Sequence, residues 1–161
     1  MTKDLISKLE NWKFQRELAL DILKSLSDKQ LNLTVGKHMG TLGEQFRHMA
    51  RVQIQYTEAI KNKKISPTQK KIDLGVAKSK EKLLELWEQV NSEMLGVLGA
   101  LSNQEVKDLI IDWEYWGIDS MNLPSHLDAL LDHGNLHNGQ IIVYLRTYEI
   151  PFPKSWEAWG L

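Results

Sequence analysis

Four long segments of the chain repeat apolar residues at intervals of three or four positions, which places those residues on one face of an α-helix. The segments run from about Thr2 to Leu26, from Thr41 to about Lys61, from Asp73 to about Leu101, and from Pro124 or Ser125 to about Thr147. The pattern predicts an all-α protein, a bundle of four antiparallel helices with loops at its ends. Arg16 falls within the otherwise apolar stripe of the first segment.

Local signals mark several helix ends. Thr41 and Glu44 have the spacing of a capping box, and Ser102 with Glu105 repeats that spacing. The other expected signals are N-caps at Thr2 and Asp73, Pro124 in the first turn of the fourth helix with Asp128 behind it, and Pro151 and Pro153 after that helix. These signals favour four separate helices.

An irregular insert separates the third helix from the fourth. Residues 109–111, Leu-Ile-Ile, have the composition of a short strand or an extended lid, and long connections of this kind are often functional. Residues 31–40 read as a loop, and the basic stretch 61–71 reads as a solvated connection. We expect the aromatic tail to pack back over the bundle. The favoured role of four tryptophans is to close the ends of the core rather than to stack on a ligand: Trp113, Trp116, Trp156 and Trp159.

Composition narrows the class of protein. The chain has 161 residues, with 20 Lys and Arg against 21 Asp and Glu, so its net charge of −1 gives no general field for nucleic acid or for a membrane surface. No apolar run is long enough for a membrane span, and no signal peptide opens the chain. We expect one domain over residues 1–161, in the cytoplasm. The chain has no cysteine, which excludes disulfides, a protein thiol nucleophile and iron–sulfur clusters.

The histidines carry the clearest chemical signal. His133 and His137 are four residues apart in the fourth helix, on the stripe that also holds His126 and Tyr144. Two imidazoles one turn apart on one face can chelate a divalent ion. They can equally be hydrogen-bonded core residues, and the spacing alone leaves both interpretations open.

A metal ion needs further ligands. His48, in the second helix, is the best candidate, although it lies about a right angle away from the centre of that helix's apolar stripe. His126 is about 10 Å along the helix axis from His133, too far to share the ion, so we expect it to line a pocket. Gly134 follows His133, so the glutamate of the His-Glu-x-x-His protease motif is absent.

At these residues the chain resembles a known family. Residues 43–53 (Gly-Glu-Gln-Phe-Arg-His-Met-Ala-Arg-Val-Gln), with Tyr56 after them, and residues 133–140 (His-Gly-Asn-Leu-His-Asn-Gly-Gln) resemble the second and fourth helices of the DinB-like (damage-inducible-B) superfamily. Asn138 stands where that motif frequently has arginine. The resemblance implies an up-down-down-up four-helix bundle, a homodimer, and one metal ion held by His48, His133 and His137. It gives His38 and His126 no ligand role.

The resemblance also suggests an activity. Members described as enzymes include transferases and isomerases that use a low-molecular-weight thiol. A site of three neutral imidazoles suits zinc, nickel, iron(II) or manganese(II), and it leaves coordination positions for water or substrate. No residue stands out as a general base. The candidates for the pocket, or for partners of the ligating imidazoles, are Gln45, Tyr56, His126, Gln140 and Tyr144, with Asp132 close by and Asp112 and Glu114 at a pocket mouth.

Three functions therefore compete. The first is an enzyme, a metal-dependent thiol S-transferase or a related hydrolase-like activity on a small molecule. The second is a non-catalytic metal-binding or stress-response module in which the ion holds two helices together. The third is a helical interaction domain that dimerises and binds no metal. The resemblance argues against the third, and we favour the first.

Overall fold

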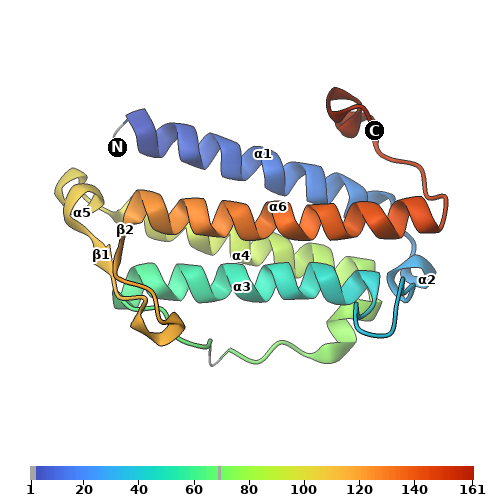
Figure 1. The fold of residues 1–161 in the computed structure, drawn as a ribbon, viewed down its shortest axis with the longest axis horizontal. Coiled ribbons are helices and arrows are strands. Elements are labelled where there is room, and N and C mark those ends of the chain that lie inside the picture. The colour runs from blue at the N-terminus through green and yellow to red at the C-terminus, as the bar shows by residue number, and fades with distance from the viewer. Residues whose placement is uncertain (1–2, 69) are drawn as a thin grey trace.

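The computed structural model describes residues 3–68 and 70–161, and its main feature is a bundle of four long helices (Figure 1). The helices are α1 (Lys3–Ser25), α3 (Leu42–Asn62), α4 (Lys80–Ala100) and α6 (Leu123–Thr147). The all-α prediction is confirmed. None of the described helices is long and apolar enough to cross a membrane.

The four helices run up, down, down and up, as the family resemblance implies (Figure 1). Helix α1 packs beside α6, and α3 packs beside both α4 and α6. The plain antiparallel arrangement is wrong for two pairs, because α1 runs parallel to α6 and α3 runs parallel to α4. The reason is the connection between α3 and α4, which returns along the whole bundle so that both helices start at the same end.

Short elements join the long helices. They are α2 (Asp28–Leu31), η1 (Leu74–Lys78), α5 (Asn103–Asp108), β1 (Ile110–Ile111), η2 (Glu114–Trp116), β2 (Met121–Asn122) and η3 (Lys154–Trp159), where η marks a 3-10 helix. Of the two alternatives for residues 109–111, the short strand is the one that forms, as β1. It pairs antiparallel with β2, so the insert folds back on itself beside the start of α6.

The two capping boxes form as predicted. The backbone N–H of Glu44 donates to Thr41 Oγ1 at 3.2 Å, and the N–H of Thr41 donates to Glu44 Oε2 at 2.7 Å. Ser102 and Glu105 make the same reciprocal pair at the start of α5. These residues satisfy backbone donors that the first helical turn leaves unpaired. The cap expected at Thr2 lies outside the described residues.

One predicted helix start is wrong. Asp73 does not cap α4: its side chain accepts the N–H of Gly75 and opens the 3-10 helix η1, and Ser79 caps α4. The sequence offers both residues as caps, and local preference alone does not choose between them. The fourth long helix begins at Leu123, one residue earlier than expected, because the Asn122 side chain accepts the N–H of Ser125 at 2.9 Å, and Pro124 lies in its first turn as predicted.

Two further residues behave differently from their expected roles. Asp128 takes no part in capping α6. Its Oδ2 forms an ion pair with Lys8 Nζ of α1 at 2.6 Å. Helix α2 was not expected, yet Ser27 and Gln30 form a third capping box at its start. The signal for α2 was present in the sequence, but four residues carry no periodicity.

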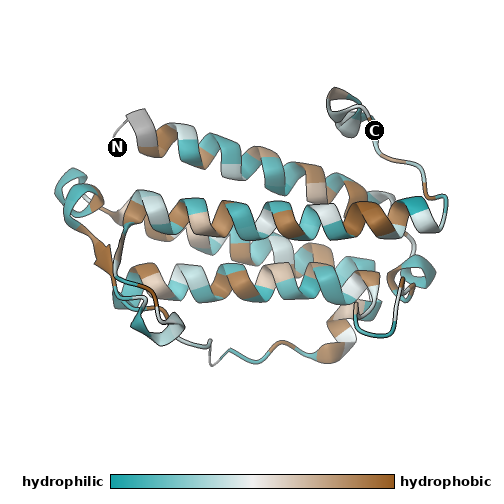
Figure 2. Ribbon diagram, in the orientation of Figure 1, coloured by the Kyte–Doolittle hydropathy of each residue, from teal (hydrophilic) through white to brown (hydrophobic). Residues whose placement is uncertain are grey.

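Buried apolar residues form two clusters, one in each half of the bundle. One contains Phe46, Trp87 and Tyr144, and the other contains Leu9, Met94 and Leu127. Between the two clusters each long helix contributes polar residues; these are Arg16, Gln53, Asn91, His133, His137 and Asn138. Figure 2 shows the resulting alternation of apolar and polar residues along the helices. We call this middle zone the polar layer.

The tail packs back over the bundle as predicted. Trp156 of η3 is buried and its Nε1–H donates to the Leu18 carbonyl at 3.0 Å. Trp113 is also buried, in agreement with a role in closing the core. That role is wrong for Trp116 and Trp159, which are 53% and 56% exposed.

Candidate metal centre

Three histidines from two helices, α3 and α6, meet where these helices face each other. His133 Nε2 of α6 lies 3.3 Å from His48 Nε2 of α3 and 3.2 Å from His137 Nε2, one turn further along α6. One ligand nitrogen from each ring lies within 4.8 Å of the others, a spacing that no other group of His, Asp or Glu among the described residues matches. The structure therefore brings together the three residues that the family resemblance implies as ligands.

The spacing of these nitrogens fits one transition-metal ion. Nitrogen ligands bind zinc at about 2.0–2.1 Å, which sets neighbouring ligands of a tetrahedron about 3.4 Å apart. The two Nε2–Nε2 distances of 3.3 and 3.2 Å are close to that value. Three imidazole nitrogens suit zinc and its neighbours in the first transition row better than magnesium or calcium, which prefer oxygen.

His48 joins the site despite its place beside the apolar stripe of α3. The stripe marks where α3 meets the apolar clusters, but α6 packs against α3 as well and carries its own polar residues to the same level. The hydrophobic pattern of one helix reports burial and contains no information about which neighbour supplies a polar partner. His48 can therefore take part in the cluster although it lies away from the centre of the apolar stripe.

Gln45, one turn before His48, orients His137. The Gln45 Nε2–H donates to the Met39 carbonyl at 2.6 Å, so its Oε1 faces His137 and accepts from His137 Nδ1–H at 2.9 Å. A proton on Nδ1 leaves the lone pair on Nε2, the nitrogen that points toward the other two histidines. Tyr144 supports this arrangement indirectly, since its hydroxyl donates to the same Met39 carbonyl at 3.0 Å.

Burial keeps the three imidazoles neutral. Desolvation, together with the charge that each ring would feel from His137, lowers the pKa of His48 and of His133 to about 4. The pKa of His137 is also lowered by burial, against the opposing effect of a hydrogen bond to the Gln140 side chain. Neutral imidazole is the form that binds metal, so at neutral pH no proton has to be displaced.

His126 has a structural role. It is fully buried and does not line the cleft described below, contrary to the expectation from the sequence. Its Nδ1 accepts from Trp113 Nε1–H at 3.2 Å, which leaves Nε2–H to donate to the Tyr56 carbonyl at 3.0 Å. His126 therefore fastens the insert, through Trp113, to α3 and α6.

We expect His126 to make the fold sensitive to acid. Burial lowers its pKa from 6.5 to about 4, so between these values the unfolded chain binds a proton that the folded chain does not. Its contribution to the free energy of unfolding is complete above about pH 6.5 and is lost as the pH falls to 4, a change of about 3 kcal/mol. Urea unfolding of metal-free protein at pH 7.5 and 4.5, with NMR titration of the imidazole, measures it. Equal losses in the parent and in His126→Gln would contradict this assignment.

An open cleft of about 570 Å³ lies over the histidines, and both His48 and His133 line it. Its other walls come from α3, from residues 65–67 and from the insert, and they include Tyr56, Trp113, Tyr115, Trp116 and Ile118. Burial and the charge of Asp132 raise the pKa of Tyr56 to about 12, so at neutral pH its hydroxyl is a donor and not a base.

Arg51, which was not among the candidates from the sequence, also lines this cleft. Its position three residues after His48 on α3 places both side chains on one face of the helix, and this spacing was the available signal. Asp112 and Glu114 do not line the cleft, because Asp112 instead pairs with Lys64 Nζ at 2.8 Å.

Fold and site together define a class of protein: a four-helix bundle with a three-histidine cluster between its second and fourth long helices. The chain belongs to the DinB family, whose family model matches residues 1–148. The crystal structure of a DinB-like protein from Bacillus subtilis, YjoA, is similar to it, with a TM-score of 0.71 and 16% sequence identity. The match covers 92% of this chain and 97% of that one, and at this identity it shows the fold alone. No curated protein matches the sequence.

Proposed function

We propose that this chain is a divalent-metal-dependent enzyme that acts on a small molecule and uses a low-molecular-weight thiol as co-substrate. One observation carries the proposal: two of the three clustered histidines, His48 and His133, line an open cleft of about 570 Å³. An ion held only to join helices needs no such access. The volume lies within the range of about 300–1,000 Å³ that is usual for small-molecule sites.

The residues around the cluster have distinct parts in this proposal. His48, His133 and His137 would hold the ion, and Gln45 fixes the ring of His137. A divalent ion held by neutral ligands lowers the pKa of a thiol or a water, which supplies a nucleophile at neutral pH. Since the chain has no cysteine, the sulfur has to come from a co-substrate. Tyr56 is placed to donate a hydrogen bond to a ligand in the cleft.

Charge near the site supports an anionic co-substrate. A second cleft of about 550 Å³ also opens on His48, and its walls include Arg47, Arg51, Lys70 and Lys71. Arg51 lines both clefts. A thiol that carries a carboxylate can therefore place its charge beside Arg51 while its sulfur reaches the histidines, and the aromatic cleft remains for the apolar electrophile.

Cobalt substitution tests this proposal directly. Cobalt(II) replaces zinc at nitrogen sites and gives a visible absorption spectrum that reports its ligands. We expect glutathione or cysteine to change that spectrum and to add a sulfur-to-cobalt charge-transfer band. A spectrum that excess thiol leaves unchanged would contradict the proposal and favour the non-catalytic metal-binding module.

Replacing Gln45 with leucine is expected to weaken metal binding by roughly 10–100-fold, the usual cost of losing a hydrogen-bond partner of a ligating histidine. The physical reason is that His137 loses the acceptor that fixes its tautomer and its ring. Calorimetric titration of metal-free protein with zinc measures the change. Gln55→Leu, on the same helix but hydrogen-bonded to the Ser66 carbonyl, is the matched control and should bind as the parent does. Equal affinity in all three proteins would remove Gln45 from the site.

A further inference from the structure

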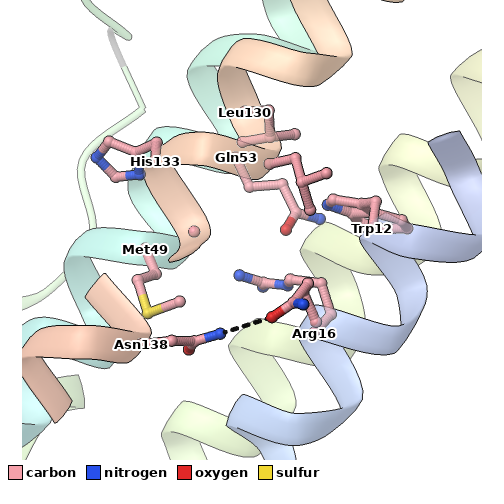
Figure 3. A pocket seen from close by; sticks show the side chains of 10 residues that line it. Trp12, Arg16, Met49, Gln53, Leu130, His133 and Asn138 are labelled. Atoms are coloured by element: carbon pink, nitrogen blue, oxygen red, sulfur yellow. Dashed lines mark hydrogen bonds between the residues drawn. The ribbon is translucent and has the colours of Figure 1, made fainter. Parts of the chain in front are cut away.

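A small cavity lies in the polar layer, beside the three-histidine cluster. It has a volume of about 20 Å³ and lies between α1, α3 and α6, and His133 lines it as well as the open cleft (Figure 3). One water molecule needs about 10–15 Å³ of such space, so the cavity has room for one.

Four polar atoms of the lining residues are buried and have no hydrogen-bond partner among the described residues. They are the donors Trp12 Nε1 and Arg16 Nη2 and the acceptors Gln53 Oε1 and Asn138 Oδ1. All four side chains are more than nine-tenths buried. A buried polar group without a partner carries its whole desolvation penalty, and four around one cavity are therefore unusual.

The neighbours of Gln53 fix which of its atoms faces the cavity. Its Nε2–H donates to the Val90 carbonyl at 3.0 Å and to Asn91 Oδ1 at 2.9 Å, so the amide cannot be turned over without losing both bonds. Oε1 is consequently the atom left without a partner, and it can only accept.

Arg16 contributes a buried positive charge. Its guanidinium lies 3.5 Å from the centre of the Trp87 ring, and its Nε–H donates to Asn91 Oδ1 at 3.3 Å. Burial lowers the pKa of Arg16 to about 9, which still leaves it charged at neutral pH. No carboxylate forms a salt bridge with it in the described part of the chain. An anion or a water oxygen can accept a hydrogen bond from its Nη2.

We propose that the cavity is a binding site for one water molecule. The water accepts from Trp12 Nε1–H and Arg16 Nη2–H and donates to Gln53 Oε1, and three hydrogen bonds are the usual number for a buried water. A halide ion would satisfy the two donors but would face Gln53 Oε1, an acceptor that its neighbours fix in place. The mixed set of donors and acceptors therefore selects water over an anion.

The position of this water links it to the metal centre. It joins α1 to α3, and His133 of α6 lines the same cavity. The water thus helps set how α1 lies against α3 beside His133.

Water–protein NOE measurements on the nitrogen-15-labelled full chain test the site. We expect a cross-peak between the Trp12 indole N–H and water, with the sign of a long-lived bound molecule. Three other buried indoles, whose N–H groups donate to protein acceptors, are internal controls and should give none: Trp87 to Phe46, Trp113 to His126, and Trp156 to Leu18. Trp12→Phe assigns the signal. A cross-peak missing from Trp12 would mean a dry cavity and would overturn the proposal.

A second measurement separates water from an anion and needs no variant. Crystals of the full chain soaked in bromide are expected to show one solvent peak within hydrogen-bonding distance of Trp12 Nε1, Arg16 Nη2 and Gln53 Oε1, and no anomalous signal there. An anomalous bromide peak between Arg16 and Trp12 would overturn the water assignment.

Discussion

Replacement of His133 by alanine is expected to abolish the binding of divalent metal ions. His133 Nε2 is the central nitrogen of the cluster, 3.3 Å from His48 Nε2 and 3.2 Å from His137 Nε2. Without it, one imidazole remains on each of two helices. The loss in affinity should therefore exceed the roughly 10–100-fold expected for an outer partner such as Gln45. Calorimetric titration of metal-free protein with zinc and nickel measures it.

Two other histidines provide matched controls for that experiment. His38 lies exposed in the loop before α3, and His38→Ala should bind metal as the parent does. His126→Gln should lower stability but leave the stoichiometry unchanged, because His126 bonds to Tyr56 and Trp113 and not to the cluster. Unchanged metal binding by His133→Ala would show that the metal binds at another site.

Gly43→Ala is expected to have the largest effect on folding. A Cβ at Gly43 would lie 1.8 Å from the Ala77 carbonyl oxygen and 3.2 Å from Leu31 Cβ. The first of these neighbours is backbone of η1, which cannot move aside as a flexible side chain can. We expect a loss of at least about 3 kcal/mol in the free energy of unfolding, or no folded protein at all.

Gly96→Ala is the control for Gly43→Ala. A Cβ at Gly96, on the exposed side of α4, meets nothing within 4 Å, and alanine should stabilise the helix by roughly 0.5–1 kcal/mol. Urea denaturation followed by circular dichroism compares the two variants with the parent. If Gly43→Ala were as stable as the parent, the close packing of η1 on the start of α3 would be wrong.

Local features of the fold were predictable from the sequence because they depend on residues a few positions apart. The capping box of Thr41 and Glu44 and the strand at Ile110 and Ile111 are of this kind. The choice between Asp73 and Ser79 as the cap of α4 was not predictable, since it depends on where η1 packs against α3. The apolar periodicity likewise does not predict in which direction each helix runs, and only the family resemblance implied it.

In the candidate site, too, some features follow from local sequence and others depend on the folded structure. The pair His133 and His137 follows from spacing on one helix, whereas His48 was a candidate against its own helical wheel and only the resemblance implied it as a ligand. Gln45 was a candidate because it lies close to His48 in the sequence. Its hydrogen bond to His137, however, joins two residues 92 positions apart and depends on how α3 packs against α6. Arg16 stood out as a charge within an apolar stripe, and its surroundings in the polar layer needed the folded structure.

The central claim is that the three histidines hold a metal ion, and metal analysis tests it most directly. Plasma mass spectrometry on protein purified without an affinity tag should find about one equivalent of a transition metal per chain in the parent and none in His133→Ala. A folded parent that contains no metal, and that takes up none of zinc, nickel, iron(II) or manganese(II) on reconstitution, would contradict the account and leave a helical interaction domain in its place.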